Sequence, residues 1–268
     1  MTASDTLQKP RVIQDTLTMI GRNLKHNLRM PVGLVMVIII PLIFLLLFVY
    51  VLGGTLGAGL AANGTRADYL AYITPAILLM AAASATQMIA VWISTDMVEG
   101  IVARFRTMAI ARSSVLAGHV YGGVILILFS TGVLLGLSLL LGYRPHAGAG
   151  HWLGLAAFLL LLAVALAWLT VALGLAAQGP ETASNTTMLL MILPLLSNGF
   201  VPTSTMPGWL QGFAKHQPFT SIVDTIRNFL DGSPQTGPII WAIGWCLVMT
   251  ILGYSWSVSS FLRRASRR

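Results

Sequence analysis

The chain has 268 residues, of which 56% are hydrophobic and only 9% are charged, whereas charged residues make up about 25% of a typical soluble domain. This small number of charges could not cover the surface of a soluble fold. The composition therefore excludes an ordinary soluble domain and predicts a polytopic membrane protein. The single cysteine, Cys246, excludes an intramolecular disulfide and a cluster of thiolate metal ligands.

The 16 Lys and Arg outnumber the 8 Asp and Glu, which in a soluble protein would suggest a nucleic-acid partner. Most of these basic residues lie in the N-terminal stretch, one internal loop and the C-terminal tail. Cytoplasmic loops of membrane proteins are enriched in Lys and Arg in this way. We therefore expect a lipid bilayer, and no nucleic acid, as the partner of these charges.

The first predicted element is an amphipathic helix over residues 11–29. Its apolar positions recur at helical spacing, and charged residues take the other face. The apolar positions are Ile13, Leu17, Ile20, Leu24 and Leu28. Such a helix is expected to lie in the cytoplasmic membrane interface.

Six charge-free windows follow, each close to the length of about 20 residues that spans a bilayer. They cover residues 32–53, 69–94, 115–141, 152–177, 183–200 and 238–261. The sequence therefore predicts a single all-α transmembrane domain over residues 1–268. An even number of spans puts both termini on one side, and with the termini inside, twelve of the 16 Lys and Arg are cytoplasmic.

Two stretches outside the windows are also expected to be helical. Residues 96–112 are too short and too charged to span, but place Met97, Ile101, Phe105 and Met108 on one face, which predicts a cytoplasmic helix with an apolar side. Residues 201–232 contain Pro207 and Pro218 at helix-start positions and Gly232 at a cap position, which predicts two short helices in an extracellular hairpin that re-enters the membrane.

Arg227 in the second short helix is expected to be neutralised locally. Asp224 precedes it by three residues and Asp231 follows it by four, and both spacings bring side chains together on a helix. We therefore expect both carboxylates to reach the guanidinium.

The stretch GFVPTSTMPGWL, from Gly199 to Leu210, resembles the signature before the last span in the membrane subunit of ABC-2 type exporters, and within that family the daunorubicin-resistance-like drug-efflux permeases. The signature continues with Gln217-Pro218-Phe219-Thr220, Val223, Arg227 and Gly232. A second match is similar to the family's cytoplasmic coupling loop and consists of Glu99-Gly100, Arg104-Phe105-Arg106-Thr107-Met108 and Arg112-Ser113. The chain departs from the usual family pattern at Ala103, Ala109 and Gln217.

The resemblance implies a permease subunit that exports a hydrophobic or amphiphilic small molecule across the inner or plasma membrane of a bacterium. It also implies two separate ABC ATPase subunits and a second permease, either a copy of this chain or a relative. The three lysines never follow glycine, so the chain lacks the phosphate-binding loop GxxxxGK[ST]. We therefore expect the chain to be no enzyme and to bind no cofactor itself, with ATP on the partner subunits.

Two sets of site residues follow from this resemblance, and a third follows from polar side chains within the spans. Residues expected to couple to the ATPase are Glu99, Gly100, Arg104, Phe105 and Arg106. Residues expected to form the hairpin and exit gate are Pro202, Pro207, Trp209, Pro218, Asp224, Arg227 and Asp231. Gln87 and Asn198 could line a substrate path, or could instead hydrogen-bond a neighbouring helix.

Several alternatives stay open at this point. Glu99 could cap its own helix, and Arg104 and Arg106 could simply mark a cytoplasmic loop. The exported molecule could be a lipid, a glycolipid or a polysaccharide. A secondary transporter or channel is the alternative from another class, although the six windows contain no Asp, Glu, Lys or Arg, which a coupled transporter often holds within its spans.

Overall fold

The computed structural model describes residues 18, 21, 31–60, 64–99 and 112–266, and the regular elements within them are all helical. The first half of the chain contains α2 (Pro31–Leu46), the π-helical turn η1 (Leu47–Leu52), α3 (Gly53–Leu60), α4 (Arg66–Val98) and α6 (Arg112–Leu140). The second half contains α7 (Ala149–Ala176), α8 (Pro180–Ile192), the 3-10 turns η2 (Leu193–Leu196) and η3 (Thr203–Thr205), α9 (Gly208–His216), α10 (Pro218–Leu230) and α11 (Thr236–Ser266).

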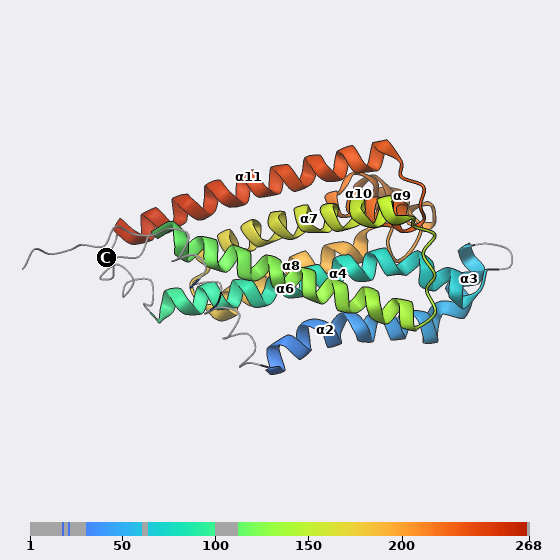
Figure 1. Cartoon of the computed structure of the whole chain (residues 1–268), viewed down its shortest axis with the longest axis horizontal. Helices are drawn as coiled ribbons and strands as arrows, with labels where there is room; N and C mark the ends of the chain where they lie inside the picture. Colours follow the sequence, from blue (N-terminus) through green and yellow to red (C-terminus); the bar gives the residue numbers. More distant parts are fainter. Residues whose placement is uncertain (1–17, 19–20, 22–30, 61–63, 100–111, 267–268) are drawn as a thin grey trace, which may run out of the picture.

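The long helices lie side by side in an elongated bundle, with α2 along one edge, α11 along the opposite edge and α4 between them (Figure 1). The central helix α4 packs against α2, α6, α7 and α8. Its most apolar stretch is 78% buried, compared with 22% in the helices that begin and end the bundle. The first and last helices therefore leave apolar faces free, as expected of helices that face lipid.

Small residues allow α4 to sit at the centre. Ala81, Ala82 and Ala83 are buried, and a Cβ at Gly174 of α7 would lie 2.8 Å from the carbonyl oxygen of Ala90 in α4. Helices that pack inside a membrane commonly approach through such small residues. At its start, α4 has a capping box that the sequence analysis did not identify, in which Thr65 and Asp68 exchange side-chain and backbone hydrogen bonds.

Within the described residues, five stretches are long and apolar enough to cross a membrane. They are Gly33–Gly59, Arg66–Val98, Leu116–Leu140, Ala149–Ala176 and Thr236–Phe261. The prediction of an all-α membrane protein is therefore confirmed. A sixth span, expected over residues 183–200, is not among them.

The chain in that region forms the 13-residue helix α8 and then the short turn η2. Pro194 lies inside η2 and supplies no backbone N–H, which favours an end to the helix. Ser197 is extended and takes over the hydrogen bonds at this break, since its hydroxyl donates to the Pro194 carbonyl and accepts from the Gly199 amide. The six-span count stays a prediction.

Two predicted elements fall mainly outside the described residues. The interfacial helix over 11–29 lies outside them apart from Thr18 and Gly21. Of the coupling helix over 96–112, Asp96 to Val98 continue α4, Glu99 ends it and Arg112 begins α6. Residues 100–111 lie outside the described part, so this helix stays a prediction.

The bundle has two distinct ends (Figure 1). One end carries α3, α9, α10 and the loop between α6 and α7, and we call it the hairpin end. The opposite end carries the end of α4, the start of α6 and the end of α11. α4 therefore runs from the hairpin end of the bundle to the opposite end, where α6 begins.

Candidate functional site

The hairpin consists of two short helices that start at the two prolines singled out in the sequence. α9 begins immediately after Pro207, and α10 begins at Pro218. α10 ends at Leu230, and Gly232 follows the C-cap residue with a φ of 69°, which favours glycine. The amides of Gly232 and Ser233 donate to the carbonyls of Phe229 and Asn228, which is the Schellman pattern of a helix C-terminus.

The two helices differ in what covers them. α10 packs against α4, α7 and α11, and its apolar face is buried. The buried residues of this face include Phe219, Ile222, Val223, Ile226 and Leu230. α9 instead exposes 80% of Trp209 and 48% of Phe213, so α10 attaches the hairpin to the bundle.

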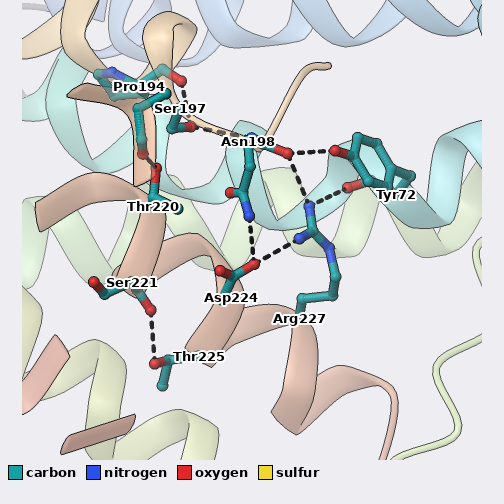
Figure 2. Close-up of polar contacts among 11 residues, drawn as sticks. Tyr72, Pro194, Ser197, Asn198, Thr220, Ser221, Asp224, Thr225 and Arg227 are labelled. Atoms are coloured by element: carbon teal, nitrogen blue, oxygen red, sulfur yellow. Dashed lines mark hydrogen bonds and ion pairs between the residues drawn. The ribbon is translucent and has the colours of Figure 1, made fainter. Parts of the chain in front are cut away.

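Arg227 on α10 is the centre of a polar network that joins three segments of the chain (Figure 2). Its Nη1 donates to Oδ1 of Asp224 at 2.8 Å, and its Nη2 donates to the backbone carbonyls of Tyr72 at 3.3 Å and Asn198 at 3.4 Å. The guanidinium carbon also lies 4.5 Å from the centre of the Tyr72 ring, a geometry that favours a cation–π interaction. We call Tyr72, Asn198, Asp224 and Arg227 the arginine network.

Asn198 and Tyr72 close the arginine network. The Asn198 side-chain amide donates to the same Asp224 oxygen at 2.7 Å, and the Tyr72 hydroxyl donates to the Asn198 carbonyl. Only 18% of the Arg227 side chain and 28% of the Asp224 side chain are exposed. Charges this far removed from water need partners, and here each has one of opposite sign together with neutral polar groups.

Asp231 does not share Arg227, contrary to the expectation from spacing. Among the described residues, the ion pair of Arg227 is with Asp224. Asp231 is the C-cap residue of α10 with its backbone still in the right-handed helical region, and it is exposed, so water can solvate its carboxylate in place of Arg227. Partial burial raises the pKa of Asp231, and the nearby charges of Arg227 and His146 oppose that effect.

The other predicted site residues take varied positions. Pro202 directly precedes η3, and Trp209 lies on the exposed side of α9. The Gln87 amide donates to the hydroxyl of Ser184 at 2.8 Å and so links α4 to α8, which favours the interpretation of Gln87 as a contact between helices. Asn198 belongs to the arginine network.

Of the residues predicted to couple to an ATPase, only Glu99 is described. It is exposed at the C-terminal end of α4, where its backbone amide donates to the Thr95 carbonyl. Gly100, Arg104, Phe105 and Arg106 lie outside the described residues. Within the described part, no group of three or more His, Cys, Asp and Glu side chains could hold a metal ion.

The two tyrosines at the start of α4 were not among the predicted site residues. Tyr72 belongs to the arginine network, and the Tyr69 hydroxyl donates to the carbonyl of Phe200 at 3.1 Å. Tyrosine near the end of a predicted span is a usable signal, because it favours the membrane interface and seeks a polar partner for its hydroxyl. The sequence does not indicate that the partner is the chain between η2 and η3.

Comparison with known proteins identifies the family. A family model described as ABC-2 type transporter matches residues 14–230. The daunorubicin resistance ABC transporter permease protein DrrB1 of Streptomyces coeruleorubidus is 29% identical over 93% of this chain and 85% of its own length. The probable doxorubicin resistance ABC transporter permease protein DrrC of Mycobacterium tuberculosis (strain CDC 1551 / Oshkosh) is 27% identical over 90% of this chain and 88% of its own length. The family match covers most of the chain, which therefore belongs to the ABC-2 type transporter family.

Proposed function

We propose that this chain is the membrane-spanning permease subunit of an ATP-driven exporter that moves a hydrophobic or amphiphilic, drug-like molecule out of a bacterial cell. The observation that carries the proposal is the near full-length similarity to two permeases named for resistance to daunorubicin and doxorubicin. The described bundle fits this role, because it consists of long apolar helices with a helical hairpin at one end.

ATP is bound and hydrolysed by partner subunits, of which there are two. The sequence has no GxxxxGK[ST] loop with which to hold phosphates. The coupling contacts are made by residues 96–112, with Glu99, Gly100, Arg104, Phe105 and Arg106 as the contact residues. Glu99 is exposed at the end of the central helix, so a force applied there acts directly on α4.

The hairpin end faces the outside of the cell, and both termini are cytoplasmic. The distribution of Lys and Arg supports this orientation, with residues 183–200 as the sixth span. A second permease, either another copy or a relative, completes the complex.

The hairpin and the arginine network shape the exit for the substrate. Two buried polar atoms in this network, Nε of Arg227 and Oδ1 of Asn198, have no hydrogen-bond partner among the described residues. A buried donor or acceptor without a partner is costly, so these two atoms can form hydrogen bonds with water or with a polar group of the exported molecule. Arg227 and Asn198 are the substrate-contacting residues of the proposed exit.

Export of doxorubicin from a sensitive, efflux-deficient bacterium tests the proposed function. Cells receive the chain together with its partner ABC ATPase, and intracellular doxorubicin is measured by fluorescence. We expect the pair to lower accumulation several-fold, and we expect Glu99→Lys to abolish the effect while Glu99→Asp retains it at equal expression. Unchanged export by Glu99→Lys would remove Glu99 from the coupling contact.

Two further measurements separate the proposal from its alternatives. ATP turnover by the purified chain alone would contradict the division of roles between permease and ATPase. Movement of a fluorescent phospholipid, with no movement of doxorubicin, would assign the complex to lipid export.

A further inference from the structure

A second contact between ionisable side chains holds α4 at the end of the bundle opposite the hairpin. Nε2 of His119 on α6 lies 3.1 Å from Oδ2 of Asp96 on α4. Only 5% of the His119 side chain and 15% of the Asp96 side chain are exposed. Ionisable residues that are buried in a membrane protein are costly, and their presence usually has a functional reason.

The position of this pair suggests that reason. Asp96 lies in the last turn of α4, three residues before Glu99, and His119 lies seven residues after Arg112, where α6 begins. The helices also pack closely here, since a Cβ at Gly123 would lie 2.8 Å from Cδ1 of Ile89. The pair therefore joins α4 to α6 beside the proposed coupling residue.

Metal binding does not explain the pair. Across the described residues, no third His, Cys, Asp or Glu completes a metal site, and a structural or catalytic metal site in a protein needs at least three such ligands. A mechanical role remains, in which a directional bond between two helices fixes their relative position.

We infer that His119 and Asp96 are positioning residues that make the end of α4 and the start of α6 move as one unit when the ATPase acts on Glu99. The displacement then travels along the rigid central helix toward the arginine network. This inference rests on the proposed function, because it assigns a role within ATP-driven transport.

Variants of the pair test the inference in the complex with the ATPase. We expect His119→Ala and Asp96→Ala each to lower doxorubicin export about two- to thirtyfold, the range for residues that transmit coupling, while ATP hydrolysis and ATPase binding are retained. The double variant should be no worse than the more impaired single variant. His119→Gln should restore export, because its side-chain amide can donate from a position close to Nε2.

Ser130→Ala is the matched control. The Ser130 hydroxyl on α6 donates to the Ala81 carbonyl on α4 at 3.2 Å, so it joins the same helices far from Glu99. We expect this variant to keep the ratio of doxorubicin exported to ATP hydrolysed. Unchanged export in both alanine variants, losses that multiply in the double variant, or an equal loss in Ser130→Ala would each overturn the inference.

A second measurement requires neither drug nor ATPase, and so separates this inference from the proposed function. Spin labels on cysteines at positions 98 and 117, which lie on α4 and α6, report the distance between the two helix ends in proteoliposomes. We expect one narrow distance distribution in the wild-type chain and in His119→Gln, and a broad one in His119→Ala. An unchanged distance distribution in His119→Ala would overturn the inference. If the distribution broadens as expected but the wild-type complex exports no doxorubicin, the result counts only against the proposed function.

Discussion

The two ends of α4 are both held by ionisable side chains, but the contacts join different things. At the hairpin end, Arg227 meets a carboxylate, two backbone carbonyls and an aromatic ring that come from α10, α4 and the chain after η2. At the opposite end, His119 meets Asp96 across two neighbouring helices. The first contact fixes three segments in one arrangement, and the second fixes the relative position of one helix pair.

The reason for this difference lies in the backbone. The chain leaves helical geometry at Ser197, so carbonyls beyond this point lose their helical donors. Irregular backbone at membrane depth is tolerated only where it is buried in protein or lines a cavity. The Tyr72 hydroxyl and the Arg227 guanidinium both donate to the Asn198 carbonyl, so the arginine network supplies the donors that the broken helix lacks.

The largest effect is expected from Arg227→Leu. The change leaves the carboxylate of Asp224 mostly buried without its cation and removes donors from two carbonyls, which should cost about 3 kcal/mol or more. We expect the melting temperature in detergent to fall and doxorubicin export to be lost at matched expression.

The partner variants show whether the pair itself is responsible. Arg227→Leu combined with Asp224→Asn should be more stable than the sum of the two single losses predicts, because the uncompensated charge is gone. Lys215→Leu, which removes an exposed cation from α9, should have little effect. Strictly additive losses would show that Arg227 and Asp224 act independently.

A smaller effect is expected from Tyr72→Phe. This change removes the hydroxyl that donates to Asn198 and keeps the ring beside Arg227, so it should cost about 1 kcal/mol, the usual value of one hydrogen bond. The measurement is the melting temperature of the purified chain in detergent.

Tyr69→Phe is the comparison for this variant, because it loses a hydroxyl bond to the Phe200 carbonyl outside the arginine network. In combination with Arg227→Leu, the Tyr72 loss should be non-additive and the Tyr69 loss additive. Equal behaviour of the two tyrosines would show that the Tyr72 hydroxyl works independently of Arg227.

The sequence predicted the parts of this structure that depend on local patterns. Charge-free windows identified the long helices, and proline and glycine positions identified both ends of α10. The spacing of Asp224 and Arg227 predicted their ion pair, because three residues is one helical turn. Glu99 could be assigned only an expected role, since its proposed partner belongs to another chain.

What the sequence missed depends on tertiary contacts or on the way a helix ends. In the run over 183–200 the α-helix ends at Ile192 and a 3-10 turn containing Pro194 follows, a break that the apolar composition of the run did not indicate. The contacts of Tyr72 with Asn198 and Arg227 join residues 126 and 155 positions apart, so spacing carries no information about them. The pairing of His119 with Asp96 likewise needs the packing of α6 on α4.

The smallest effect, and one of opposite sign, is expected from Asp231→Asn. Partial burial raises the pKa of Asp231, and its position at the C-terminal end of α10 also disfavours a negative charge. A carboxyl whose pKa is higher in the folded than in the unfolded state destabilises the fold above the folded-state pKa, and this cost disappears as the pH falls below the unfolded-state value of about 4.

Asp231→Asn should therefore raise the free energy of unfolding near neutral pH by less than about 0.5 kcal/mol, because solvent screens this exposed group, and the melting temperature should rise slightly. The gain should shrink as the pH is lowered through the pKa of Asp231 in the folded chain, where the wild-type carboxyl becomes neutral. The same series in a His146→Gln background removes one nearby titratable group, and Tyr143 is a further neighbour whose pKa is raised by burial and by the Asp231 charge. Asp224→Asn should lower stability at neutral pH, because Asp224 is the carboxylate that Arg227 binds. If Asp231→Asn lowered stability as much as Asp224→Asn does, Arg227 would be shared between both carboxylates.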